Sequence, residues 1–128
     1  MRGPMTVSNS RGPLVYACSG CSSVAQLANQ LALRLQTAGV AEMSCIAGVG
    51  GDVAPLVKQA RSGRPILALD GCQLQCVRNC LARHDVTPTW HELLTDYGIR
   101  KKYRQPWSEE AAERIFPVLV DRLQGSAA

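Results

Sequence analysis

The stretch ILALDGCQLQCVRNC, residues 66–80, runs from four apolar residues into three cysteines placed four positions apart. An apolar run without polar alternation is typical of a strand that is buried on both faces of a sheet. Asp70 and Gly71 then predict a turn, and the spacing of apolar residues predicts a helix over about residues 72–84. The stretch therefore predicts one strand–helix unit of a parallel α/β sheet, with thiols after the strand.

The same order of elements occurs earlier in the chain. Residues 14–17 form a short apolar run that predicts a buried strand. The following helix has a Ser23-x-x-Gln26 capping box at its start and Gly39 where its C-terminal cap belongs.

A second unit begins with a predicted strand over residues 43–47 and a tight glycine-rich turn over residues 48–51. Asp52 is the expected N-cap of the next helix, and Pro55 fits its first turn. Gly63 is expected to end that helix.

The C-terminal third of the chain predicts a fourth strand and a final helix. The strand is expected within residues 87–94, where Pro88 confines it to an edge of the sheet or to a late start. Ser108 is the expected N-cap of the helix, and Pro117 is expected to kink it. The buried stripe of this helix would consist of Ala112, Ile115, Phe116, Leu119 and Leu123.

Alternating strands and helices predict parallel pairing with right-handed crossovers. We therefore expect an α/β fold: a single three-layer Rossmann-like domain whose mostly parallel sheet has about four strands, with helices on both faces. This domain is expected over residues 14–124. A flexible N-terminal arm over residues 1–13 and a C-terminal tail over residues 125–128 are expected to flank it.

Composition narrows the classes of function. The chain has 128 residues, of which 46% are hydrophobic and 19% charged, as in a globular protein. No apolar run approaches the ~18–20 residues of a membrane helix, and the N-terminus lacks the apolar core of a secretory signal. We expect a cytoplasmic protein that does not bind membranes. In that compartment, six cysteines indicate metal or thiol chemistry rather than disulfides.

The net charge of +4 is concentrated in the sequence RKKYR, residues 100–104. A basic cluster with a tyrosine can contact nucleic acid or an anionic surface. A solvated loop between two elements accounts for the cluster as well. We favour the loop and do not expect nucleic-acid binding.

Cysteines follow three of the predicted strands at their carboxyl ends, where ligand sites gather in such sheets. Cys18 ends the first strand, Cys45 lies near the end of the second, and Cys72 follows the third. Cys76 would lie one helical turn after Cys72 on the same face. Four thiolates about 2.3 Å from one ion form a closed structural zinc site. The sequence therefore predicts a zinc site to which these four thiols can contribute.

One further cysteine leaves alternatives open. Cys21 forms a Cys-x-x-Cys motif with Cys18, so it competes for a place in the site with Cys45, which could instead fill the core. The motif also occurs in redox dithiols. The alternative is therefore a thiol-dependent redox or sulfur-transfer enzyme, with Cys18 or Cys72 as nucleophile and Cys21 or Cys76 as resolving thiol.

No other residues resemble the machinery of an enzyme. Cys72 and Arg78 match the Cys-x5-Arg spacing of enzymes that bind oxyanions, but the residues between them lack glycine and look helical. Cys80 is expected to pack, and His91 to pack or face solvent. Asp70 would form the turn or support a metal ligand. We expect a binding protein rather than an enzyme.

Four segments of the chain resemble those of a known family. They are ACSG at residues 17–20, QLAN at 26–29, MSCIAG at 43–48 and LDGC at 69–72, with Cys76 after the last. They are similar to the Asp-Gly-Cys (DGC) domain family of zinc-binding proteins, and the resemblance covers roughly residues 14–102. It implies four cysteine ligands, which correspond here to Cys18, Cys45, Cys72 and Cys76. It also implies that Cys21 and Cys80 are additions of this chain. The native metal stays open, because copper(I) and iron–sulfur clusters also suit thiolates.

Overall fold

The structure, a computed structural model, describes residues 12–125, so most of the expected N-terminal arm and C-terminal tail lies outside the described residues. The elements follow in the order β1 (Leu14–Ala17), α2 (Ser23–Thr37), β2 (Glu42–Met43), α3 (Ile46–Gly50), α4 (Ala54–Ala60), β3 (Ile66–Asp70), α5 (Cys76–Ala82), β4 (Trp90–Leu93), η1 (Leu94–Tyr97) and α6 (Glu109–Gln124). The sheet has four strands in the order β2-β1-β3-β4, all parallel. The expected α/β, Rossmann-like class is confirmed.

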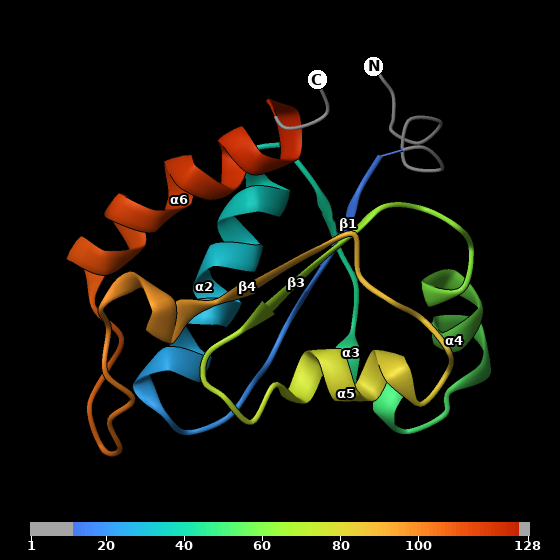
Figure 1. The fold of residues 1–128 in the computed structure, drawn as a ribbon, viewed down its shortest axis with the longest axis horizontal. Helices are drawn as coiled ribbons and strands as arrows, with labels where there is room; N and C mark the ends of the chain where they lie inside the picture. Colours follow the sequence, from blue (N-terminus) through green and yellow to red (C-terminus); the bar gives the residue numbers. More distant parts are fainter. Residues whose placement is uncertain (1–11, 126–128) are drawn as a thin grey trace.

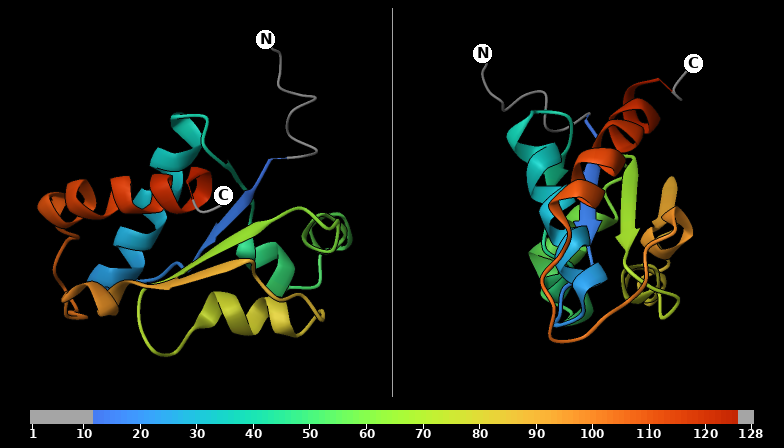
Figure 2. Two further views of the ribbon diagram at one scale, coloured as in Figure 1. Left: turned by 45° about the horizontal axis from the view of Figure 1, so that its top comes forward. Right: turned by 90° about the vertical axis from the view of Figure 1, so that its left-hand side faces the viewer.

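The sheet lies between two layers of helices. The helices α2 and α6 pack against each other on one face, and α3, α4 and α5 cover the other (Figures 1 and 2). Every residue of β1 and β3 is buried, as the absence of polar alternation predicts. Leu14 pairs with Ile66 and Ala17 with Leu69, so β1 and β3 end side by side. The segments that follow these two strands therefore meet at one edge of the sheet.

The cap of α2 lies one residue earlier than predicted. Ser22, not Ser23, is the N-cap, and its Oγ accepts a hydrogen bond of 3.2 Å from the N–H of Ala25. The Gln26 side chain donates to a backbone carbonyl before the helix and so does not close the predicted capping box. At the other end, Gly39 has a φ of 75°, the left-handed conformation expected directly after a helix.

The second unit differs from its prediction. The expected strand over residues 43–47 is wrong, because β2 has only two residues and α3 follows it closely. The glycines expected to form a turn lie in α3 and directly after it. Asp52 is not a helix cap but has a left-handed φ of 63°. At Gly48 a Cβ atom would lie 2.0 Å from Cδ1 of Leu56, so this glycine allows α3 and α4 to pack closely.

The helix expected from about residue 72 starts later. It begins at Cys76 and ends at Ala82. Residues 71–75 form a turn, and Gln75 has a left-handed φ of 54° directly before the helix. The prediction that Cys72 and Cys76 lie on one helical face is therefore wrong. These two cysteines lie on a turn and at a helix start.

The last two predicted elements are close to expectation. The strand β4 lies at the edge of the sheet and starts after Pro88. Ser108 caps α6 by accepting a hydrogen bond of 3.1 Å from the N–H of Ala111, and the helix continues through Pro117. Its buried stripe differs from the prediction at two residues: Phe116 is only partly buried, and Ala111 is buried as well. None of the helices in residues 12–125 has both the length and the apolar run needed to span a bilayer.

Candidate thiol site

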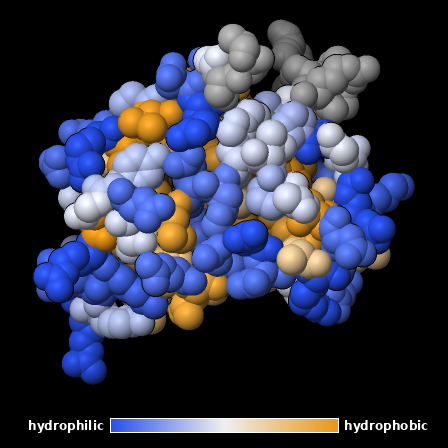
Figure 3. Space-filling view, viewed as in Figure 1, coloured by the Kyte–Doolittle hydropathy of each residue, from blue (hydrophilic) through white to orange (hydrophobic). Residues whose placement is uncertain are grey.

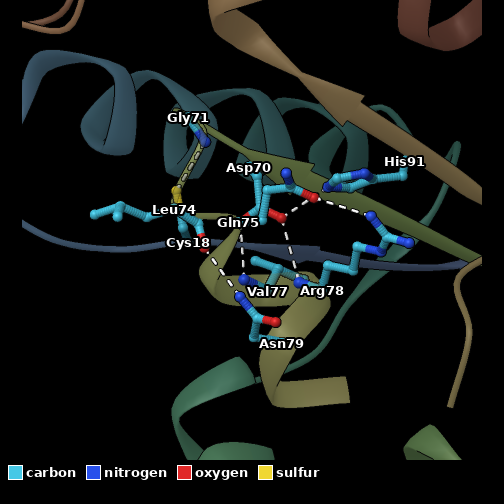
Figure 4. Close-up of polar contacts among 9 residues, drawn as sticks. All are labelled: Cys18, Asp70, Gly71, Leu74, Gln75, Val77, Arg78, Asn79 and His91. Carbon is cyan, nitrogen blue, oxygen red and sulfur yellow. Dashed lines mark hydrogen bonds and ion pairs between the residues drawn. The ribbon is translucent and has the colours of Figure 1, made fainter. Parts of the chain in front are cut away.

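Asp70, the last residue of β3, is buried, with 1% of its surface exposed. Its Oδ1 accepts a hydrogen bond of 2.8 Å from the N–H of Val77, and its Oδ2 accepts one of 3.2 Å from the N–H of Arg78 (Figure 4). The N-cap residue of α5, Gln75, makes no capping hydrogen bond with its side chain. Asp70 therefore caps α5 from the end of β3, which explains why the helix begins at Cys76.

The third partner of this carboxylate is His91 of β4. Its Nε2 lies 2.8 Å from Oδ2 of Asp70, and 23% of the imidazole side chain is exposed. A buried carboxylate is unfavourable unless its oxygens are hydrogen-bonded, and two amides and one imidazole meet that need here. Sequence reasoning missed this role because no local pattern reveals it. The pair depends on the parallel pairing of β3 and β4, which brings Asp70 within reach of His91, 21 positions later in the chain.

The thiol of Cys18 lies directly after β1, against the backbone of Gly71. Its Sγ accepts a hydrogen bond of 3.2 Å from the N–H of Gly71, and only 8% of Cys18 is exposed. A side chain would not fit at Gly71, because a Cβ atom there would lie 2.7 Å from the carbonyl carbon of Val24 in α2. Glycine therefore lets the end of β3 approach both Cys18 and the start of α2.

The surroundings of Cys18 favour its neutral form. Burial raises the pKa of the Cys18 thiol to about 11, although the Gly71 hydrogen bond opposes this shift. The charges of Asp70, Cys76 and Cys72 raise it further, so the sulfurs of these cysteines lie within electrostatic reach of Cys18. In the metal-free protein at neutral pH, Cys18 is a neutral thiol and a poor nucleophile.

Cys72 and Cys76 are more accessible than Cys18. Cys72 is half-buried, and its Sγ accepts a hydrogen bond of 3.4 Å from Nζ of Lys101. A cavity of about 520 Å³ opens beside it, lined also by Gln73, Leu74, Thr95 and Lys101. Cys76 is exposed at the start of α5. Both sulfurs can therefore be approached from solvent.

Cys45 lies on the surface between β2 and α3. It is the N-cap of α3, where its Sγ accepts a hydrogen bond of 3.4 Å from the N–H of Gly48, and it is exposed. The alternative in which Cys45 fills the core is therefore wrong. Burial is the main cause of the raised pKa of Tyr16 in β1, and the charge of Cys45 adds to it. Cys45 is thus close enough to Tyr16 to affect the pKa of that residue, whereas it is not among the groups that raise the pKa of Cys18.

The other two cysteines have different surroundings. Cys21 is exposed in the segment between β1 and α2. Cys80 is half-buried, and a Cβ atom on Gly50 would lie 3.0 Å from its sulfur. Burial raises the pKa of Cys80. Cys80 therefore packs α5 against α3, as expected.

The Cys-x5-Arg spacing does not form an oxyanion loop. The amides that could face an oxyanion, those of Val77 and Arg78, already donate to Asp70. The Arg78 guanidinium donates to the side chain of Gln75 at 3.1 Å instead of closing over the turn. These two amides are thus not free to bind an oxyanion.

The donor set suits a thiophilic metal ion, because thiolates are the preferred ligands of such ions. The structure brings Cys18, Cys72 and Cys76 near the end of β3, whereas Cys45 follows the edge strand β2, which pairs with β1. All six cysteines are free thiols. Within residues 12–125, no group of three or more histidine, cysteine, aspartate or glutamate side chains is arranged to hold a metal ion. Metal binding would therefore require the accessible thiols to reorient.

Comparisons with known proteins give one family and one relative. The sequence profile of the DGC domain matches residues 14–119. The anaerobic and virulence modulator AnvM of Pseudomonas aeruginosa is 66% identical over 111 residues, which make up 87% of this chain and 84% of that protein. No solved structure matches the chain.

Proposed function

The chain belongs to the DGC domain family, and from the thiols within the matched residues we propose that it is a small cytoplasmic protein that binds zinc. The proposed ligands are Cys18, Cys45, Cys72 and Cys76. One observation carries the proposal: the sulfur of Cys18 contacts Gly71, the residue directly before Cys72. The segments that follow two strands far apart in sequence thus touch each other, and each carries a cysteine whose thiolate zinc would favour as a ligand.

Some of these thiols would have to move more than others to bind one zinc ion together. Cys18 is fixed by burial and by its hydrogen bond to Gly71, whereas Cys72 and Cys76 lie on a turn and at a helix start. The latter two can turn toward Cys18 without disturbing the core. Bound zinc would supply the positive charge that keeps the sulfurs deprotonated. Because the pKa of Cys18 is raised to about 11, Cys18 would release a proton on binding, and acid is expected to weaken the site.

The role that we propose is regulatory. The relative with 66% identity is named as a modulator. In this chain the carboxylate of Asp70 is fully engaged by two amides and His91, so it serves the architecture of the site rather than acid–base chemistry. We place the protein in the cytoplasm because free thiols persist in a reducing compartment.

Metal content tests this proposal. We expect protein purified under reducing conditions to contain about one zinc ion per chain by inductively coupled plasma mass spectrometry. Single substitutions Cys18→Ser, Cys72→Ser and Cys76→Ser should each lower that content strongly, because each removes a sulfur ligand. Cys45→Ser should weaken zinc retention against a competing chelator.

Two other cysteines supply matched controls for the same measurement. Cys21→Ser and Cys80→Ser also remove one thiol each, but from outside the proposed ligand set. Both variants should keep their zinc. Zinc loss as large in these controls as in Cys72→Ser, or no zinc uptake by reduced wild-type protein on reconstitution, would contradict the proposal. A brown preparation that contains iron would indicate that the site holds an iron–sulfur cluster instead of zinc.

The Cys72–Lys101 contact favours a second candidate, a thiol-dependent redox or sulfur-transfer enzyme with Cys72 as nucleophile. Nζ of Lys101 lies 3.4 Å from the Cys72 sulfur, and a cavity through which a reagent can approach adjoins this sulfur. Alkylation of metal-free protein by iodoacetamide, followed by peptide mass spectrometry, tests this candidate. Cys72 should react fastest and Lys101→Met should slow it. Alkylation of Cys72 that is as slow as alkylation of Cys21 would contradict a role of Cys72 as nucleophile.

A further inference from the structure

A second cavity, of about 370 Å³, lies between the start of α2, the loop over residues 98–108 and the start of α6. Its lining includes the basic residues Arg100, Lys102 and Arg114 and the apolar residues Ile99 and Pro106. Cavities of ~300–1,000 Å³ are typical of small-molecule sites. We propose that this basic cavity binds a small organic carboxylate, with its charged group at the basic side chains and its apolar body against Ile99 and Pro106.

The positively charged side chains that line the basic cavity outnumber the negatively charged ones. Arg114 pairs with Glu110 at 3.6 Å and donates to the carbonyl of Tyr97 at 3.2 Å. The side-chain charges of Arg100 and Lys102 have no ion-pair partner in the part of the chain that the structure describes. Glu110 is the one carboxylate in the lining, against three cations. An excess of positive charge therefore faces the cavity, and an anion would balance it.

The walls of the basic cavity are held in place without a ligand. Ser23 and Lys102 exchange two hydrogen bonds: the Ser23 N–H donates to the Lys102 carbonyl at 2.8 Å, and the Lys102 N–H donates to Ser23 Oγ at 3.0 Å. Arg34 of α2 pairs with Glu109 at the start of α6 at 2.7 Å. These two connections fix both sides of the cavity, so less conformational freedom is lost when a ligand binds.

The ends of the two helices do not themselves provide the site. Ser22 and Ser108 already accept hydrogen bonds from the first turns of α2 and α6. The argument therefore rests on the basic side chains and on the cavity. The location of the cavity also supports a ligand site, because α2 follows the carboxyl end of β1 and ligands bind at that edge of parallel sheets. The loop lies at the lower left of Figure 1, toward which β3 points, and strongly hydrophilic side chains cover this region in Figure 3.

The structure divides the basic cluster of residues 100–104. Arg100 and Lys102 line the basic cavity, whereas Lys101 donates to Cys72 and Arg104 lies outside the lining. The cluster is thus not one continuous basic face of the kind that follows a nucleic-acid backbone. This division favours a small anion over nucleic acid.

A titration of isotope-labelled protein with sodium benzoate, followed by two-dimensional NMR, tests the proposal. Saturable shifts of amide signals from residues 98–111 and from the start of α2 are the expected result. Benzamide, which has the same ring without the charge, should bind at least roughly tenfold more weakly. Inorganic phosphate, which has the charge without the ring, should also bind more weakly than benzoate. Equal binding of benzoate and benzamide would overturn the proposal, as would the absence of saturation.

Two double variants separate the basic cavity from general surface charge. The double variant Arg100→Gln with Lys102→Gln should bind benzoate roughly tenfold or more weakly than the wild type. It removes both of the lining cations that have no ion-pair partner. Arg61→Gln with Arg104→Gln removes the same charge outside the lining and should leave the affinity unchanged. Equal weakening in both would overturn the proposal. So would a single-stranded RNA that binds more tightly than benzoate and loses affinity equally in both variants.

Discussion

The carboxylate of Asp70 joins three parts of the chain. It ends β3, accepts hydrogen bonds from the first turn of α5 and pairs with His91 of β4. Gly71 next to it is required because the chain passes directly against α2, and Cys72 then reaches the surface. Each residue of the Asp-Gly-Cys sequence thus has its own role. Asp70 caps α5, Gly71 lets the chain approach α2 closely, and Cys72 presents an accessible thiol.

We expect Asp70→Asn to lower the free energy of unfolding by about 2–4 kcal/mol. An amide group of the same shape cannot accept hydrogen bonds at both of its ends, so one buried donor would lose its partner. Urea unfolding monitored by circular dichroism measures the change. Asp52→Asn is the control, since Asp52 is an exposed carboxylate that pairs with Arg83, and it should change stability far less. Equal unfolding midpoints for Asp70→Asn and the wild type would refute the role of Asp70 as a cap.

Tyr97 is expected to make stability fall in alkaline solution. Burial, followed by a hydrogen bond of 2.7 Å to Glu92, raises the pKa of Tyr97 from 10.0 to about 12. The folded state therefore holds the phenol proton more tightly than the unfolded chain. This stabilisation is complete below about pH 10 and is lost as the pH rises toward 12. Tyr97→Phe should show a shallower loss of stability over that range in urea unfolding, and an unchanged pH profile would contradict the assignment.

The strands β1 and β3 were predictable from the sequence because their signal is local, whereas β2 was not, since it has only two residues. The residues of β1 and β3 lack polar alternation, and burial on both faces is its direct cause. The starts of α2, α3 and α5 were not predictable in the same way. The cap of α5 comes from Asp70, seven positions before the amide that it binds, and the glycine at residue 48 serves the packing of Leu56 rather than a turn. Both depend on tertiary contacts that the spacing of residues does not encode.

Adjacent serines at the start of α2 have separate tasks that hydrogen exchange can distinguish. Ser22→Ala should cost about 1 kcal/mol and speed exchange of the Ala25 amide, which loses its cap. Ser23→Ala should instead speed exchange of the Lys102 amide. Mass spectrometry with fragmentation, or NMR, locates the change. Faster exchange at Gln26 in the Ser23 variant, with an unchanged Ala25 amide in the Ser22 variant, would mean that the capping box predicted from sequence is correct and the observed cap is not.

Topology explains which part of the thiol site could be inferred from sequence. Parallel strands end at one edge, so Cys18 and Cys72 were expected together, and the structure places Cys18 against the residue before Cys72. Lys101 and His91 were not found, because they reach the site from the loop after η1 and from β4. Spacing within one strand–helix unit carries no information about such distant contacts. The orientation of the thiols also depends on the turn over residues 71–75, of which residues 72–75 were expected to be helical.

X-ray absorption at the zinc K-edge tests the central claim most directly, because it identifies the atoms bound to the metal. The sample is wild-type protein purified under reducing conditions, with Cys45→Ser as comparison. We predict a shell of four sulfur atoms at about 2.3 Å in the wild type, and the loss of one sulfur in the variant. A shell dominated by oxygen or nitrogen in the wild type would contradict the account.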